Sequence, residues 1–81
     1  MNYLTLYGKP GCHLCQVMKG VIEEVGGRRP IQLREINILD DPADYQRYRH
    51  DIPVLLLAGR EIARHRLTVR LLEEALDGEG K

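Results

Sequence analysis

The sequence has no net charge, no long apolar run and no leader-like start, and each absence excludes a class of protein. Twelve Lys and Arg residues balance twelve Asp and Glu residues, which removes the electrostatic reason to expect a nucleic-acid or membrane partner. No apolar run approaches the roughly 20 residues that span a bilayer. The first residues contain neither a basic segment nor a long apolar one, so we expect no signal peptide and a cytoplasmic location.

Internal repeats, low-complexity tracts and linkers are also absent, so residues 1–81 are expected to form one small domain and to act as a monomer. The share of hydrophobic residues is 43% and that of charged residues is 30%. These values are ordinary for a globular protein with a core of its own.

Cysteine is scarce: Cys12 and Cys15 are the only two, and they are separated by His13 and Leu14. In a reducing compartment such a pair is more often catalytic or metal-binding than a permanent crosslink. The surrounding residues must decide between these two uses.

Hydrophobic patterning around the pair predicts a strand, a turn and a helix. Residues 2–7 alternate in the manner of a strand. After the Gly8–Gly11 turn, apolar residues recur at the spacing of one helical face: Leu14, Val17, Met18, Val21, Ile22 and Val25. Gly26 and Gly27 are expected to end this helix. Because Leu14 belongs to the apolar face, Cys12 is expected at the helix N-terminus.

The remaining sequence predicts three strands and two helices. Residues 31–38 read as an edge strand, 54–58 as a strand covered on both faces, and 61–65 as its antiparallel return strand after a turn. Asp40-Asp41-Pro42 begins a short helix, with an aspartate as its cap and proline at its first position; it reaches about Arg49 and is expected to pack through Tyr45 and Tyr48. Thr68 caps a last helix whose core-facing residues are expected to be Val69, Leu72, Ala75 and Leu76. Residues 77–81 are expected to fray.

The predicted order is therefore β-α-β-α-β-β-α. It describes an α/β fold with a four-stranded mixed sheet and helices on both faces. A helix between the first two strands implies a parallel crossover, and the last two strands form a hairpin.

The expected position of Cys12 favours thiol chemistry. Free backbone N–H groups and the helix dipole stabilise a thiolate at a helix N-terminus. Lys9 adds a nearby cation, and His13 adds another when it is protonated. We therefore assign Cys12 as the attacking thiolate, Cys15 as the resolving thiol, and Lys9 and His13 as thiolate-stabilising residues.

Metal binding is the alternative use of the pair. Structural zinc sites usually need four ligands from two separated pairs, and here there is one pair with three histidines elsewhere in the chain. His13 adjoins Cys12 and cannot easily share a tetrahedral site with both cysteines. A cluster bridged between two subunits, or a non-catalytic adaptor module with the same fold, stays open at this point.

Pro53 precedes an apolar strand, an unusual place for proline unless it starts the strand or forms a cis bond. A cis Ile52–Pro53 bond would turn the Ile52 backbone toward an extended substrate. Ile52 and Pro53 are therefore candidate substrate-binding residues. Tyr7 joins them because it ends its strand beside the cysteine motif.

Taken together, these residues resemble the glutaredoxin branch of the thioredoxin fold, and more closely its small bacterial glutaredoxin-like proteins. The run from Tyr7 to Cys15 is similar to the family's tyrosine-x-lysine-proline-x-cysteine active site. Ile52-Pro53 falls where the family has its cis-proline, and Gly59 where it has a hairpin glycine. The resemblance implies dithiol–disulfide exchange on a disulfide-containing protein or a low-molecular-weight thiol. It also implies that a separate thiol system resets the protein.

The sequence departs from the family at the glutathione-binding stretch. Glutaredoxins usually carry a Gly-Gly pair and then an acidic residue after the last strand, whereas this chain has Ala63-Arg64-His65-Arg66-Leu67. Arg64 or Arg66 is the candidate replacement. Thioredoxins usually carry Trp-Cys-Gly-Pro-Cys, and this chain has no Trp. We expect no bound cofactor and slow turnover with glutathione as reductant.

Overall fold

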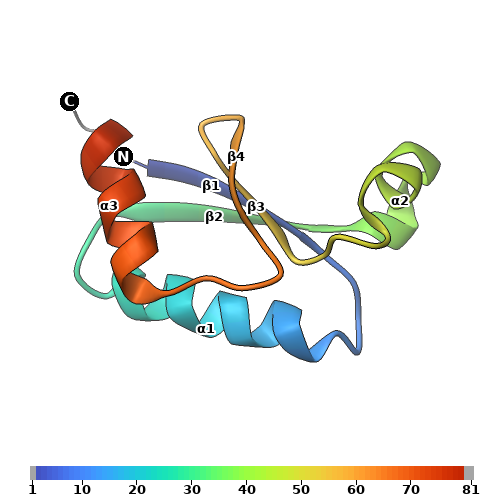
Figure 1. Ribbon diagram of the computed structural model, residues 1–81, viewed down its shortest axis with the longest axis horizontal. Helices are drawn as coiled ribbons and strands as arrows, with labels where there is room; N and C mark the ends of the chain where they lie inside the picture. The colour runs from blue at the N-terminus through green and yellow to red at the C-terminus, as the bar shows by residue number, and fades with distance from the viewer. Residues whose placement is uncertain (1, 80–81) are drawn as a thin grey trace.

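The computed structural model describes residues 2–79 and follows the predicted order of elements (Figure 1). The strands are β1 (Asn2–Gly8), β2 (Ile31–Asn37), β3 (Val54–Leu57) and β4 (Arg60–Arg64). The helices are α1 (His13–Gly26), α2 (Pro42–Tyr48) and α3 (Val69–Glu79), with a short 3₁₀ turn, η1 (Ile38–Asp40), before α2.

The four strands form one mixed sheet in the order β2-β1-β3-β4. β1 pairs in parallel with β2 and antiparallel with β3, and β3 pairs antiparallel with β4. Leu4 of β1 lies between Leu33 of β2 and Leu57 of β3. The predicted fold class is therefore confirmed, with β2 as an edge strand.

Two of the predicted helix starts have the expected caps. The Asp41 carboxylate accepts a hydrogen bond of 2.8 Å from the Ala43 N–H, and Pro42 occupies the first turn of α2. The Thr68 hydroxyl accepts a bond of 3.1 Å from the Leu71 N–H at the start of α3. These local hydrogen bonds satisfy N–H groups that the helices cannot satisfy internally.

The main core lies on the face of the sheet that α1 and α3 cover. Its buried members from the strands are Leu4, Leu6, Leu55 and Leu57, and those from the two helices include Met18, Ile22, Val25, Leu72 and Leu76. On the other face, Tyr48 of α2 packs with Ile38 and Val54 in a smaller cluster. Tyr3, elsewhere on that face, is 62% exposed. Helices therefore lie on both faces, but α2 covers only one end of the second.

The buried face of α1 differs from the prediction. The residues buried on α1 are Cys15, Met18, Ile22 and Val25, while Leu14 is 37% and Val17 is 49% exposed. The apolar arc of this helix is wider than the surface that the sheet and α3 cover. The side of α1 that carries the buried residues therefore faces the core, and Leu14 and Val17 lie at the edge of that buried side. The spacing placed Leu14 and Val17 on the apolar face of this helix, but neither is buried.

Two smaller expectations were also wrong. Tyr45 was expected to pack, but it is 37% exposed, with the Arg49 guanidinium 5.8 Å from its ring centre. Of the two tyrosines, only Tyr48 joins the buried cluster with Ile38 and Val54. Residues 77–79 were expected to fray, but α3 continues to Glu79, and Asp77 forms a 2.7 Å ion pair with Arg29. The remaining residues of that expectation, 80–81, lie outside the described residues.

Candidate functional site

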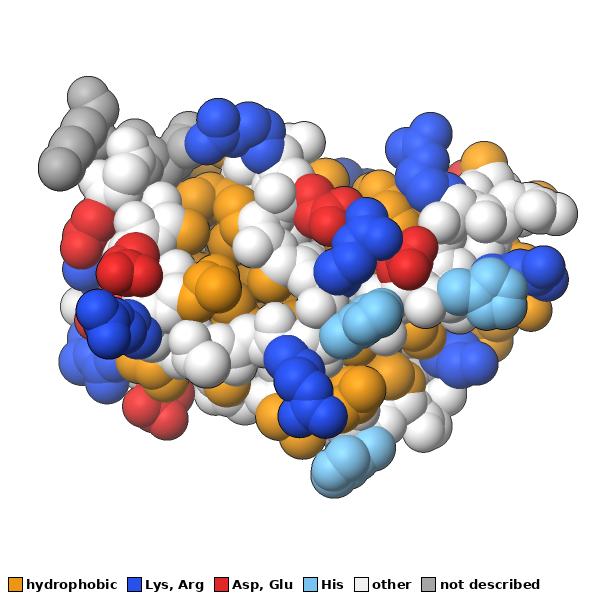
Figure 2. Space-filling model, viewed as in Figure 1, with side chains coloured by type: hydrophobic (Ala, Val, Ile, Leu, Met, Phe, Trp, Pro, Cys, Tyr) orange, Lys and Arg blue, Asp and Glu red, His pale blue; other side chains and the backbone are white. Residues whose placement is uncertain are grey.

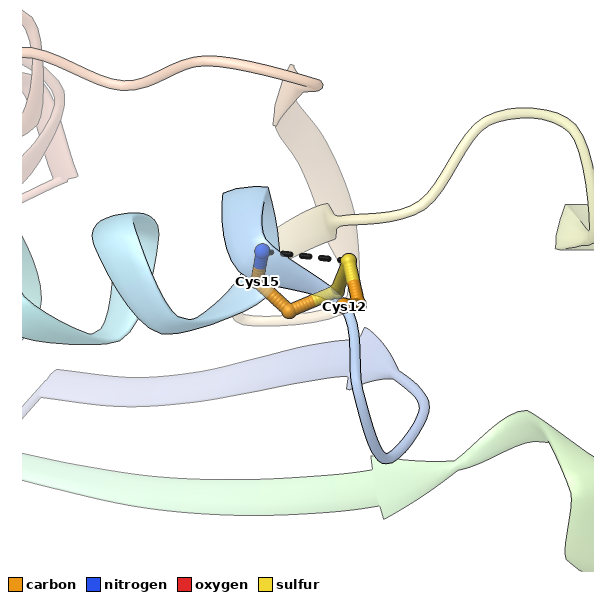
Figure 3. The surroundings of a disulfide bond; sticks show 2 residues. All are labelled: Cys12 and Cys15. Carbon is orange, nitrogen blue, oxygen red and sulfur yellow. Dashed lines mark hydrogen bonds between the residues drawn. A yellow bond between two sulfur atoms is a disulfide. The ribbon is translucent and has the colours of Figure 1, made fainter.

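Cys12 caps the N-terminus of α1, as the sequence predicts. β1 ends at Gly8, and a tight turn follows in which the Cys12 N–H donates to the Lys9 carbonyl at 3.4 Å. Gly11 in this turn has a φ of +79°, a conformation that glycine adopts without steric cost. Cys12 itself is extended, and its sulfur accepts a hydrogen bond of 3.2 Å from the Cys15 N–H (Figure 3).

The two cysteines form a disulfide, with 5.2 Å between their Cα atoms. Cys12 is partly exposed, whereas Cys15 is only 9% exposed. Gly8 makes room for the inner cysteine, since a Cβ on Gly8 would lie 2.9 Å from the Cys15 Sγ. A thiol from outside can therefore reach Cys12 more easily than Cys15.

The surroundings of the Cys12 sulfur favour a negative charge. The first turn of α1 holds no acidic residue, and the sequence has no Asp or Glu between residues 1 and 22. When the disulfide is reduced, the Cys15 N–H and the helix dipole would stabilise a thiolate at Cys12.

Lys9 and His13 lie on either side of Cys12 in the chain, and both are exposed. Lys9 also borders a cavity of about 320 Å³ between α1 and β2, whose lining includes Cys15, Gln16 and Pro10. A 3.3 Å ion pair between Lys19 and Glu35 joins α1 to β2 beside it. Among residues 2–79, no three His, Cys, Asp or Glu side chains come together in a way that could hold a metal ion.

Pro53 lies opposite the end of β1. Val54 pairs with Tyr7 on one side and with Arg64 on the other, which places Pro53 beside Gly8 and beside the loop that follows β4. Pro53 is buried, and the Ile52–Pro53 peptide bond is cis. The Pro53 carbonyl accepts a hydrogen bond of 2.7 Å from the His65 N–H.

Tyr7 packs on the face of the sheet that α2 covers, away from the main core. Its ring lies 4.5 Å from the Tyr48 ring, centre to centre, at an interplanar angle of 34°. Burial raises the pKa of Tyr7, and the neighbouring Tyr48 and Asp44 raise it further. The observed role of Tyr7 is packing, and its contact with a substrate stays a prediction.

Arg64, the last residue of β4, is the centre of an ion-pair cluster that sequence reasoning missed. Arg64 donates hydrogen bonds of 2.6 and 2.7 Å to Glu61 and lies 3.3 Å from an Asp51 oxygen. The pairing with Glu61 raises the pKa of Arg64 and lowers that of Glu61. Asp51 also lies 3.9 Å from the His65 ring nitrogen. Since Asp51 is far from Arg64 in the sequence, only the β3–β4 hairpin brings them together.

This cluster separates the two candidate replacements for the glutathione-binding residues. Arg64 is engaged by Glu61 and Asp51, so it is not available to a ligand without breaking those pairs. Arg66 is exposed and forms no ion pair within the described part of the chain. His65 has a φ of +69°, the left-handed conformation that a glycine would adopt at lower cost.

The sheet order and the Cys-x-x-Cys pair at the start of α1 define the protein as a member of the thioredoxin-fold class with a dithiol site. Solved structures agree. The protein XcR50 from X. campestris has a TM-score of 0.79 and 30% identity, with 93% of this chain and 96% of that chain covered. Protein Ne2328 from Nitrosomonas europaea has a TM-score of 0.79 and 25% identity, with 91% and 89% covered. Thioredoxin 1 from Thermosipho africanus, at 18% identity, a TM-score of 0.62 and 98% and 99% coverage, shares the fold.

The family follows from the sequence. The family described as glutaredoxin-like domain (DUF836) matches residues 3–77. The chain belongs to this glutaredoxin-like family, as the resemblance of the cysteine motif predicted. Among residues 2–79, no helix has the length and apolarity needed to cross a membrane.

Proposed function

We propose that this protein is a cytoplasmic thiol–disulfide oxidoreductase that reduces protein disulfides or mixed disulfides. One observation carries the proposal. The partly exposed Cys12 sulfur sits at the N-terminus of α1, accepts a hydrogen bond from the Cys15 N–H, and is bonded to the buried Cys15 sulfur. This arrangement provides one accessible nucleophile and one internal thiol within reach of it.

The reaction would begin with the reduced dithiol. The Cys12 thiolate attacks one sulfur of the substrate disulfide, the substrate S–S bond breaks, and its electron pair leaves on the first substrate thiolate, which takes a proton from water. Cys15 then loses its proton and attacks the Cys12 sulfur. The second substrate thiolate leaves, and the Cys12–Cys15 disulfide forms. The substrate has gained two electrons, and an external thiol reductant must return two to the protein.

The neighbouring residues support each step. Lys9 would add a positive charge near the Cys12 thiolate, and His13 would add a second one when it is protonated. Ile52 and Pro53 border the site opposite the end of β1, where an extended substrate backbone would lie. We propose a monomer, with no bound cofactor or metal and no nucleic-acid or membrane partner.

Glutathione is proposed as a poor reductant of the Cys12–Cys15 disulfide. Arg64, one of two candidate contacts for its carboxylates, is already paired with Glu61 and Asp51. The test is the rate of reduction by glutathione alone and by thioredoxin reductase with thioredoxin. Rapid turnover with glutathione alone would overturn this part of the proposal.

The function itself is tested by disulfide reduction with wild type, Cys12→Ser and Cys15→Ser. We expect Cys12→Ser to abolish reduction, because the attacking sulfur is gone. Cys15→Ser is expected to form a mixed disulfide at Cys12 that persists and can be detected by mass spectrometry. Full activity in Cys12→Ser would show that the assignment of the nucleophile is wrong.

A further inference from the structure

Two hydrophobic side chains are exposed beside the cysteine pair. Leu14 and Val17 are 37% and 49% exposed, and their spacing places them on one side of the first two turns of α1. Figure 2 shows hydrophobic side chains at the surface over the N-terminal part of α1, next to Lys, Arg and His side chains. Single exposed hydrophobic residues are ordinary, but this pair begins two residues after the Cys12 sulfur.

The segments that border Cys12 carry positive charge and no carboxylates. The protein as a whole is neutral, yet neither residues 8–18, on either side of Cys12, nor residues 62–67, at and after the end of β4, contain an Asp or Glu. The second segment includes the loop after β4, which the His65–Pro53 hydrogen bond holds beside the site. Leu67 of this loop joins the same core cluster as Met18 of α1. The residues after β4 therefore lie on the same face of the sheet as α1.

Two cations and one histidine in these segments are available to a partner. Lys9, His13 and Arg66 are exposed, and none of them forms an ion pair with another described residue. Other cations are already engaged, as Lys19 is with Glu35 and Arg64 is with Asp51. Asp51, an acidic residue beside Pro53, shares Arg64 with Glu61. The exposed charged side chains adjoining Cys12 in the chain and after β4, Lys9 and Arg66, are positive.

We propose that this surface, formed by Leu14, Val17, Lys9, His13 and Arg66, docks an acidic segment of a protein substrate. An apolar side chain of the substrate lies on Leu14 and Val17, and carboxylates on either side of its disulfide pair with the cations. This inference rests on the proposed disulfide-reductase function and names its substrate class.

The occupant is a polypeptide rather than a small thiol because of the shape of the surface. Pockets for small molecules are concave and bury 70–90% or more of a drug-sized ligand. The side of α1 that carries Leu14 and Val17 is the convex surface of a helix, which cannot enclose a small molecule, and neither side chain lines the cavity between α1 and β2. An extended chain can contact the apolar pair and the separate cations at once, and charges at the edge of such a contact mainly increase the rate of association.

The experiment compares four disulfides as substrates of the reduced protein. Two are peptides that carry the same reporter on a mixed disulfide and the same neighbouring Leu, flanked by Glu in one and by Lys in the other. The third is the uncharged hydroxyethyl disulfide, and the fourth is oxidised glutathione, a small anion. Each kcat/KM is divided by that of the same variant with hydroxyethyl disulfide, so that a change in thiol reactivity cancels.

We expect wild type to prefer the Glu peptide over the Lys peptide by about tenfold at low salt, and by much less at high salt, because salt screens exposed charges. Arg66→Glu is expected to remove most of this preference. The matched control is Arg70→Glu, which makes the same change in charge. Arg70 lies near Arg28, after the C-terminal end of α1, away from Cys12, so the preference is expected to persist.

The apolar part of the surface is tested with Leu14→Ser/Val17→Ser. This variant is expected to raise KM for the Glu peptide several-fold, and to have little effect when Ser replaces the Leu in that peptide. Both side chains are partly exposed, so thermal unfolding is expected to show that the variant stays folded.

The outcomes separate the inference from the function. Equal rates for the Glu and Lys peptides, with hydroxyethyl disulfide reduced normally, would overturn the docking surface and leave the function standing. A preference for oxidised glutathione as strong as that for the Glu peptide would show that a small anion suffices, and would overturn the choice of a polypeptide. Failure to reduce any of the four disulfides would overturn both.

Discussion

Gly8 at the end of β1 packs directly against the Cys15 side chain. A Cβ at Gly8 would lie 2.9 Å from the Cys15 sulfur and 3.3 Å from the Cys15 Cβ, the first of which is closer than such atoms normally approach. The strand and the first turn of α1 can therefore lie this close only because residue 8 has no side chain. The position of the resolving thiol depends on this contact.

Gly8→Ala is expected to displace Cys15 and to slow formation of the Cys12–Cys15 disulfide about tenfold, or roughly 1.4 kcal/mol in the barrier. The measurement is the lifetime of the mixed disulfide at Cys12, followed by acid quenching and mass spectrometry. The control is Gly20→Ala in α1, the helix that carries Cys15. An added Cβ at Gly20 would meet nothing within 4 Å. Gly20→Ala should leave the lifetime of the mixed disulfide unchanged. A lifetime in Gly8→Ala equal to that in wild type would rule out the positioning role of Gly8.

The corrected burial of α1 predicts a sharp contrast between neighbouring apolar residues. Ile22 is 2% exposed and Val17 is 49% exposed. Ile22→Ala is expected to reduce the free energy of unfolding by about 2–5 kcal/mol, since it leaves a cavity in the main core. Val17→Ala is expected to cost less than about 0.5 kcal/mol, as is usual for surface substitutions. Urea unfolding measures both, and similar losses would contradict the observed orientation of the helix.

The Glu61–Arg64 pair predicts a loss of stability in acid. The hydrogen bond from Arg64 lowers the pKa of Glu61 from its ordinary value of 4.5. The folded protein therefore binds fewer protons at Glu61 than the unfolded chain does. The contribution of the pair is fully present above this ordinary pKa and is lost as the pH falls through the lower, folded value.

This loss is measured as the difference in Tm between wild type and Glu61→Gln from pH 6 to pH 3. We expect the difference to shrink toward acid pH. Glu23→Gln is the control, because Glu23 is exposed and its side chain forms no ion pair with any of residues 2–79. A difference for Glu61→Gln that stays constant over this range would contradict the prediction.

His65 is held in a left-handed conformation, with a φ of +69°, by the hydrogen bond from its N–H to the Pro53 carbonyl. Such a conformation costs a residue other than glycine about 1–2 kcal/mol. His65→Gly is therefore expected to keep or raise the free energy of unfolding. His65→Val is expected to lower it by more than about 1 kcal/mol, because β-branched residues fit this region worst. Chemical unfolding of both variants provides the test. A larger free energy of unfolding for His65→Val than for His65→Gly would contradict the observed backbone conformation.

Much of the fold could be predicted because its signals are local. The alternation in residues 2–7, the cap at Asp41 and the cap at Thr68 depend on side chains only a few residues apart. The position of Cys12 at the start of a helix is a signal of the same kind. The packing of Tyr7 could not be predicted from the sequence in the same way, because its contact with Tyr48 depends on which face of the sheet α2 covers.

The sequence by itself determined that the two cysteines would meet at a helix N-terminus. Side chains three positions apart at the start of a helix lie one above the other, and this spacing is a local property of the chain. Only the tertiary structure decided which part of the wide apolar arc of α1 is buried and that Leu14 and Val17 stay exposed. It also decided that Arg64 is engaged by Asp51 while Arg66 is not. Burial and ion pairing depend on surfaces that come from distant parts of the chain, and no local pattern specifies how those surfaces meet.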